Sequence, residues 1–257
     1  MRGAWAAVIA MAAALSGPSQ VPLDDLRFER WSKTALSFLD RPSYFLGREV
    51  LIALPVPPPP ANSASETRAE LDGLLALQAH RTREQQRSIE GHREFASVCE
   101  AMLRTVHASA SSAPRTRALL AHVEQDASLA VFHAKRRFNR PRPHQLEPRL
   151  HPCIAVPGHP AYPSGHALQG YLVARVLSLM RPEDGDALMA AGTSIGYERE
   201  VAGLHYPSDA VASRALGEAL MDRLQTNERF LAEVAAARAE LRQEPDPRRA
   251  PDGRANR

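Results

Sequence analysis

Two basic residues in the middle of the chain have a spacing that suits an anion site. Lys135 is followed by six residues and then by Arg142 and Pro143. Lysine offers a compact positive charge to a phosphate group, and arginine offers a planar fork of N–H donors. Alone, such a pair is weak evidence, because most basic clusters are solvated surface.

A second segment, Tyr162-Pro163-Ser164-Gly165-His166, precedes an apolar run with helical spacing. Ser164 suits the N-cap of a helix, and Gly165 lets a ligand approach the backbone closely. The free amides of a helix N-terminus attract anions, and His166 in the first turn could reach a bound group. The alternative is a capped helix with a surface histidine.

In a third segment, Arg199 is followed by five residues, His205, three residues and Asp209. Pro207 favours the first turn of a helix, so Asp209 should lie one turn beyond His205. A carboxylate at that place can accept the proton of one imidazole nitrogen and leave the other nitrogen free to attack. A structural histidine bonded to an aspartate is the alternative.

Taken together, the three segments resemble the signature of the type 2 phosphatidic acid phosphatase superfamily: Lys-x6-Arg-Pro, Pro-Ser-Gly-His and Arg-x5-His-x3-Asp, in that order. Spacing selects Arg142 over Arg140, although both precede a proline. The proline-rich segment 54–60, with Ala61-Asn62-Ser63 after it, is similar to the region upstream of the site in bacterial class A non-specific acid phosphatases. The resemblance covers roughly residues 50–215.

The resemblance implies an all-α, single-domain helical bundle of the acid phosphatase/vanadium haloperoxidase type. It also implies hydrolysis of phosphate monoesters through a phosphohistidine. His205 would attack phosphorus with Asp209 orienting it, and His166 would protonate the leaving oxygen and then activate water. The phosphate would be bound by Lys135, Arg142, Ser164, Gly165 and Arg199. No cofactor and no metal are expected, because the other histidines of this region lack a metal-ligand spacing. They are His133, His144, His151 and His159.

One position departs from the pattern, since Glu198 stands where the family has a serine. Its carboxylate could support Arg199 or face solvent, and it would oppose phosphate binding if it pointed into the site. Two other functions stay open. A vanadate-dependent haloperoxidase shares the signature, and a non-catalytic phosphate-binding protein would share the anion site.

Helical spacing dominates the remainder of the chain, for instance at Leu120, Val123, Ala127, Ala130 and Val131. Segment 54–60 should be extended. Few residues precede it, so we expect a strap across one domain at 21–242 rather than an interdomain linker. The spacing predicts helices over 23–40, 65–107, 115–138, 165–181, 184–198, 207–224 and 227–242.

Both ends of the chain have features of their own. Residues 1–20 carry a basic residue, a short apolar run and small residues, as a signal peptide does, and predict export to the periplasm or the medium. The polar, proline-rich stretch 243–257 is expected to be a disordered tail. In an oxidising compartment Cys99 and Cys153 could pair as a disulfide.

Composition limits the partners. Apolar residues make up 44% and charged residues 24% of the 257 residues, as in a soluble globular protein. The net charge of +3 is too small to argue for nucleic-acid binding. Small-molecule phosphate esters are the expected partners, with no stable membrane insertion after the signal peptide is removed. The sequence leaves open the natural substrate and a homo-oligomer.

Overall fold

The computed structural model describes residues 21–109 and 111–243. These residues form helices joined by loops, with no β-strand among them, so the predicted all-α class is confirmed. The signal peptide expected at 1–20 lies outside the described residues. So does the tail expected at 243–257, apart from Gln243.

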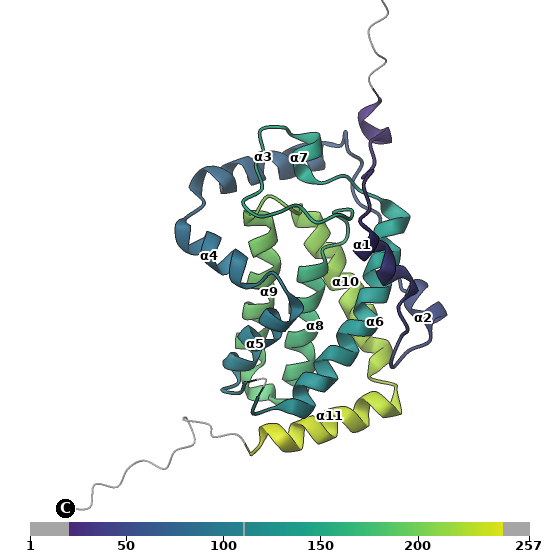
Figure 1. Ribbon diagram of the computed structural model, residues 1–257, viewed down its shortest axis with the longest axis vertical. Coiled ribbons are helices and arrows are strands. Elements are labelled where there is room, and N and C mark those ends of the chain that lie inside the picture. The colour runs from purple at the N-terminus through teal and green to yellow at the C-terminus, as the bar shows by residue number, and fades with distance from the viewer. Residues whose placement is uncertain (1–20, 110, 244–257) are drawn as a thin grey trace, which may run out of the picture.

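The centre of the molecule is helix α8 (Gly165–Met180), which is surrounded by other helices (Figure 1). It packs against α6 (Pro114–Phe138), α9 (Gly185–Val201) and α10 (Pro207–Leu224). Most of its residues are buried around the whole circumference, as expected for a helix in the middle of a bundle. The start of α8 therefore lies inside the protein and not at its surface.

Helices α8 and α9 approach each other closely at two glycines. A Cβ atom on Gly170 would collide with the backbone oxygen of Gly192, and a Cβ on Gly192 would collide with that of Gly170. Only glycine allows two helix backbones to come this near. The crossing brings the start of α8 and the end of α9 to the same end of the bundle.

Four helix ends meet there, at the upper end of the bundle in Figure 1. They are the C-terminal ends of α6 and α9 and the N-terminal ends of α8 and α10. The other helices surround this group: α1 (Lys33–Ser37), α2 (Arg48–Ile52), α3 (Ser65–His80), α4 (Arg83–Gly91), α5 (Phe95–Thr105), α7 (Pro143–Leu146) and α11 (Glu228–Leu241).

The expected single helix over 65–107 is wrong, because the chain forms α3, α4 and α5 in its place. Thr82 stops the first of these helices and caps the second: its hydroxyl accepts from the amide of Gln85, and the Gln85 side chain accepts from the amide of Thr82. The second break follows Gly91, where the chain leaves helical geometry between His92 and Glu94. The two breaks bend this segment around the bundle.

The expected helix over 23–40 is also wrong, since the segment has only short helical turns. Residues around Phe28 are held extended by hydrogen bonds to Asn139 just after α6. The Phe28 amide donates to the Asn139 carbonyl, and the Asn139 side chain donates to the Phe28 carbonyl, each at 3.0 Å. Segment 55–60 is extended, as predicted, and its Pro57 carbonyl accepts from the Tyr162 hydroxyl.

The expected disulfide is not formed, because Cys99 and Cys153 are both free thiols. Cys99 points from α5 into the main core, beside Val98 and Met102. Cys153 packs on a separate apolar cluster that contains Val201 and Leu204. The two sulfur atoms belong to different parts of the interior.

Candidate active site

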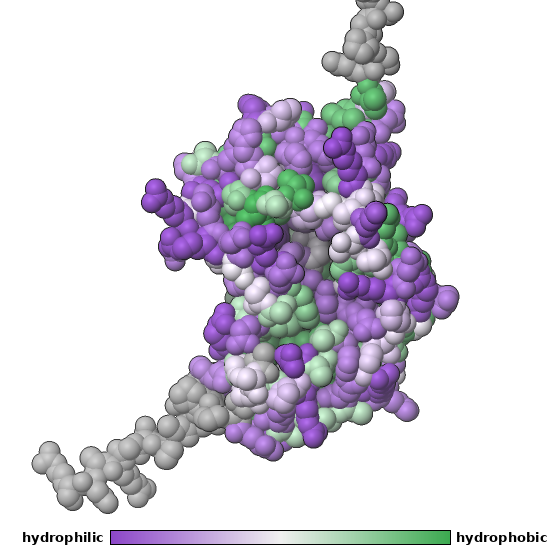
Figure 2. Space-filling model, viewed as in Figure 1, coloured by the Kyte–Doolittle hydropathy of each residue, from purple (hydrophilic) through white to green (hydrophobic). Residues whose placement is uncertain are grey.

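A cavity of about 600 Å³ opens where the four helix ends meet. Figure 2 shows this face of the molecule hollowed near its middle, with hydrophobic side chains above the hollow. Five of the eight residues expected to do chemistry line the cavity, namely Lys135, Gly165, His166, Arg199 and His205. Arg142, Ser164 and Asp209 are buried directly behind them.

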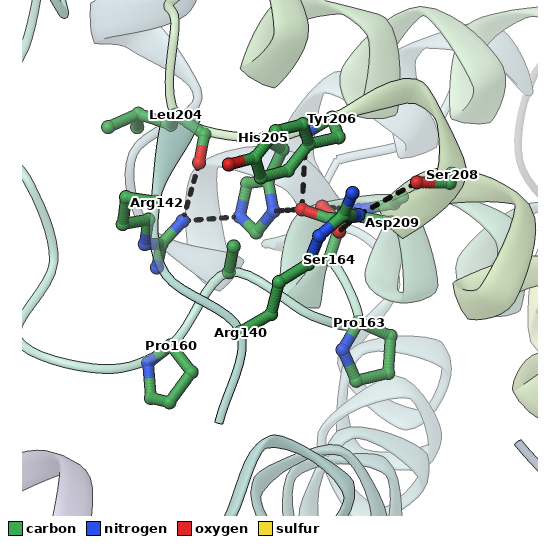
Figure 3. A network of polar contacts seen from close by, with 12 residues as sticks. Arg140, Arg142, Pro160, Pro163, Ser164, Leu204, His205, Tyr206, Ser208 and Asp209 are labelled. Carbon is green, nitrogen blue, oxygen red and sulfur yellow. Dashed lines mark hydrogen bonds and ion pairs between the residues drawn. The ribbon is translucent and has the colours of Figure 1, made fainter. Parts of the chain in front are cut away.

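His205 has a defined orientation. Its Nδ1 atom lies 2.8 Å from Oδ2 of Asp209, one helical turn away (Figure 3). The same Oδ2 accepts from the amide of Tyr206 at 3.1 Å, so the carboxylate acts as an acceptor. The proton therefore lies on Nδ1, and Nε2 carries the lone pair.

Arg142 lies against that lone pair. Its Nη1 atom is 2.9 Å from Nε2 of His205 and donates to the carbonyl of Leu204 at the same distance. Its Nε donates to the carbonyl of His159 at 3.1 Å, so the guanidinium is fixed from several sides. Arg142 is the arginine that the six-residue spacing selects, and the structure brings it to His205.

Lys135 reaches the site from the end of α6, but its three protons already have partners. The Nζ atom donates to the carbonyls of Pro160, Ala161 and Pro163 at 2.9, 3.0 and 2.5 Å. The ammonium thereby holds the loop that leads into α8. Burial, with the charge of Arg142, lowers the pKa of Lys135 well below its usual range.

The start of α8 has the predicted form. Ser164 is the N-cap, and its hydroxyl accepts from the amide of Ala167 at 3.4 Å. A Cβ atom on Gly165 would meet nothing within 4 Å, so the glycine leaves open space at the helix N-terminus. Backbone amides in such a position bind anions.

His166, in the first turn, contacts the carbonyl of Arg93 through Nε2 at 3.1 Å. Burial, and after it the nearby charge of Arg199, lowers the pKa of His166 to about 3. The pKa of His205 is also well below its usual range, because of burial and then of Arg142 and Lys135. Both imidazoles are thus neutral near pH 7 in the ligand-free protein.

Arg199 approaches from α9 and is supported by Glu198. The Nη2 atom of Arg199 donates to the carbonyl of Ile89 at 3.0 Å and to Glu198 at 3.1 Å. The Glu198 carboxylate is itself held by Ser88 at 2.6 Å and His92 at 2.9 Å, and it does not line the cavity. The departure from the family pattern therefore places a carboxylate behind Arg199 and outside the anion site.

Two residues of this region were not assigned a role in the sequence. Arg140 donates to Oδ1 of Asp209 at 2.8 Å and to Glu70 on α3 at 3.1 Å. His159 lines the cavity, with Nδ1 at 3.0 Å from Nη2 of Arg142. The doubled Arg-Pro at 140–143 was a signal for Arg140. The cluster of histidines at 133, 144, 151 and 159 predicted a residue at the rim of the site, and His159 lines the cavity.

The comparisons with known proteins agree with this geometry. The model of a family described as the PAP2 superfamily matches residues 119–222, the part of the chain that holds all three motifs. The resemblance expected from the motifs is thus confirmed for this stretch. The matched residues include α8, α9 and most of α6 and α10, which position the site.

Two curated relatives of the PAP2 domain are each named non-specific acid phosphatase. The relative from Salmonella typhimurium is 42% identical over 81 residues, or 32% of this chain and 32% of its own. The relative from Providencia stuartii is 31% identical over 135 residues, or 50% of this chain and 54% of its own. The matches therefore span about a third to half of the relatives.

A solved structure shares the fold. It is titled a crystal structure of the first bacterial vanadium-dependent iodoperoxidase and aligns with a TM-score of 0.54 at 17% identity. The alignment covers 81% of this chain and 62% of the other. The predicted fold type, that of the acid phosphatases and vanadium haloperoxidases, is confirmed.

Two features of the described residues concern metal binding and membrane spanning. Within residues 21–109 and 111–243, no group of three or more His, Cys, Asp or Glu side chains is arranged to hold a metal ion. None of the helices in that same part of the chain is long and apolar enough to cross a membrane.

Proposed function

We propose that this protein is an acid phosphatase that hydrolyses phosphate monoesters through a phosphohistidine on His205, without a metal. One observation carries the proposal: His205 is bonded at Nδ1 to Asp209, which leaves the lone pair on Nε2, and the residue lines a cavity together with Lys135 and Arg199. In the ligand-free protein Nη1 of Arg142 lies 2.9 Å from Nε2, so this N–H has to turn to the phosphate before Nε2 attacks. The two curated relatives named non-specific acid phosphatase support it.

In the first step, Nε2 of His205 attacks phosphorus, and the bond from phosphorus to the ester oxygen breaks. Asp209 stabilises the positive charge that develops on the imidazole, since its Oδ2 already accepts from Nδ1. His166, in its protonated form, gives a proton to the departing oxygen. In the second step the neutral His166 takes a proton from water, and the resulting hydroxide releases phosphate from His205.

The anion would be bound by charges in a buried setting, where they act strongly. Arg199 contributes a donor with no other use, because its Nε atom is buried and has no partner among the described residues. Arg142 and Lys135 contribute charge from fixed positions, and Ser164 and Gly165 contribute the N-terminus of α8. Phosphoryl transfer needs little more than such positioning and charge stabilisation.

The test is to trap the covalent intermediate. Brief reaction with a 32P-labelled ester followed by acid-free quenching should leave label on His205, and His205→Ala should abolish both labelling and turnover. Label on a serine or an aspartate would contradict the mechanism.

Metal independence has a separate test. EDTA should leave activity intact, and activity that returns only with added zinc or magnesium would contradict metal independence. Orthovanadate should inhibit, because it mimics five-coordinate phosphorus.

We also propose that the protein acts outside the cytoplasm, as its expected signal peptide implies. Expression of the full chain in a bacterial host, followed by N-terminal sequencing of the protein in each cell fraction, tests this. A periplasmic product that begins near residue 17 to 21 is expected. An uncleaved cytoplasmic product would contradict export.

A further inference from the structure

The cavity extends well beyond the space that a phosphate needs, along one face of α6. Glu124, Ser128, Val131 and Lys135 all line it. Their steps of four, three and four residues place them in one stripe of the helix. Lys135 lies at the phosphate end of this stripe, and Glu124 lies three turns away, roughly 16 Å along the helix axis.

Glu124 is fixed by two neighbours that use the same oxygen. Oε1 accepts from the Ser128 hydroxyl and from the side-chain amide of Gln169 on α8, each at 2.8 Å. The other oxygen, Oε2, has no hydrogen-bond partner among the described residues and is not among the fully buried atoms. Oε2 is therefore an accessible oxygen without a partner, on a residue that lines the cavity.

The cavity that Glu124 lines has mainly apolar walls. Phe38, Phe95, Phe132 and Leu168 contribute walls of the same cavity. Burial raises the pKa of Glu124 to about 7, against the opposing effects of the hydrogen bonds from Gln169 and Ser128 and then of the charge of Arg41. A carboxyl group in such a place is costly unless a polar group binds to it.

We propose that Glu124 binds a hydroxyl group on the leaving group of the ester, so that the preferred substrates are phosphate monoesters with an apolar frame and a hydroxyl at the end far from the phosphate. This inference rests on the proposed phosphatase function. Gln169 lies three residues after His166 on α8. The helix that carries the expected general acid thus also holds the carboxyl group that would recognise the other end of the substrate.

The protonation of Glu124 favours a hydroxyl over an ammonium group. In acid, where the carboxyl is neutral, Oε2 carries a proton that it can donate, and above neutrality Oε2 only accepts. A hydroxyl both accepts and donates, so it can bind Glu124 in either form. An ammonium group only donates and would be bound well only by the charged form.

The experiment compares pairs of aryl phosphates with equal numbers of heavy atoms. The first pair is 4-(hydroxymethyl)phenyl and 4-ethylphenyl phosphate; the second is 4′-hydroxybiphenyl-4-yl and 4′-methylbiphenyl-4-yl phosphate, which reaches further from the phosphate. The full protein should favour the hydroxyl member of at least one pair by about tenfold in kcat/KM. Glu124→Leu should bring this ratio close to one.

Three controls make the result specific. Glu124→Gln, which keeps the shape and the capacity to donate and accept, should retain most of the ratio. Gln169→Met should lower it in part, which provides a test if Glu124→Leu does not fold. Glu218→Leu, an equal change on the exposed face of α10, should leave the kcat/KM ratio unchanged. The inhibition constant of inorganic phosphate should stay the same in every variant.

The outcomes separate the two proposals. If none of the four esters releases phosphate, the phosphatase function fails. If all four are hydrolysed but Glu124→Leu leaves both ratios at the wild-type value, the leaving-group site is wrong and the phosphatase function stands. A stronger preference for 4-(aminomethyl)phenyl phosphate than for the hydroxymethyl ester at pH 5 would also overturn the assignment to a hydroxyl.

Discussion

Arg140 and Asp209 form a buried ion pair, with Nη1 of the arginine 2.8 Å from Oδ1 of the aspartate. The other oxygen of Asp209 binds His205, so the carboxylate is held between the two side chains. Glu70 accepts from Arg140 and also from the amide and hydroxyl of Ser208. Through this network helix α3 fixes the aspartate that orients the expected nucleophile.

Weakening that support should lower turnover without weakening phosphate binding. We expect Arg140→Lys to reduce kcat by about 10- to 100-fold, because a lysine keeps the charge but not the fork that holds Asp209 and Glu70 together. The inhibition constant of inorganic phosphate should change by less than about threefold, since Arg140 does not line the cavity. A matched loss of phosphate binding would show that Arg140 acts on the ligand directly.

Asp209→Asn tests the tautomer of His205. An amide that donates to Nδ1 would favour the wrong tautomer, with the proton on Nε2. We expect kcat to fall by about 10³- to 10⁴-fold, with the fold retained by circular dichroism. A fall of less than about tenfold would mean that Asp209 has no part in presenting the Nε2 lone pair.

Glu198→Ser tests the departure from the family pattern. Because Glu198 partly neutralises Arg199 from behind, its removal should lower the inhibition constant of phosphate by about three- to tenfold. The freed charge of Arg199 should also lower the pKa of His166 further, which moves the basic limb of the activity profile to lower pH. Glu218→Ser is the surface control, and weaker phosphate binding in Glu198→Ser would show that Glu198 mainly keeps Arg199 in place.

The pH profile of kcat should be a bell with an optimum between about pH 4.5 and 6.5. Burial and nearby cations lower the pKa of both histidines, so His205 stays neutral well into acid and His166 gains its proton only at low pH. A bound phosphate dianion favours charged His166 and raises its pKa. The basic limb of kcat should therefore lie at higher pH than that of kcat/KM, and the reverse order would contradict the role of His166.

Gly170→Ala should destabilise the protein at the crossing of α8 and α9. The added Cβ meets the backbone of Gly192, which cannot move as a side chain could, so we expect a loss of about 1 to 3 kcal/mol in the free energy of unfolding by urea. Gly73→Ala on α3 is the matched control, since nothing lies within 4 Å of its Cβ. Equal stability of the two variants would mean that the helices can separate at no cost.

The sequence predicted the site because its three motifs lie at helix ends that local chemistry defines. Pro143, the Ser164 cap and Pro207 each mark where a helix begins, and the six-residue spacing selects Arg142, which lies beside His205. The contacts between distant segments had no such signal. Nothing near Glu70 in the sequence indicates that it meets Arg140 and Ser208, and nothing near Ser88 indicates that it holds Glu198.

The errors in secondary structure have the same cause. Helical spacing continues through 65–107, but a capping box at Thr82 and the bend after Gly91 divide it. Around Phe28, pairing with Asn139 replaces the helix that the local sequence favours. Glu124 could have been seen on the stripe with Lys135, yet a carboxylate on a long helix is usually solvated, and only the packing of α8 shows that it is enclosed.

The walls of the cavity come from two separate stretches of the chain. Lys135, His166, Arg199 and His205 lie within residues 119–222, which match the PAP2 superfamily model. Phe38, Arg41, Arg93 and Phe95 reach the same cavity from the first hundred residues. Mutations in that first stretch can reshape the wall while the reacting groups keep their positions. Divergence in substrate choice among such proteins can therefore proceed by changing residues that no motif contains, at little risk to the chemistry.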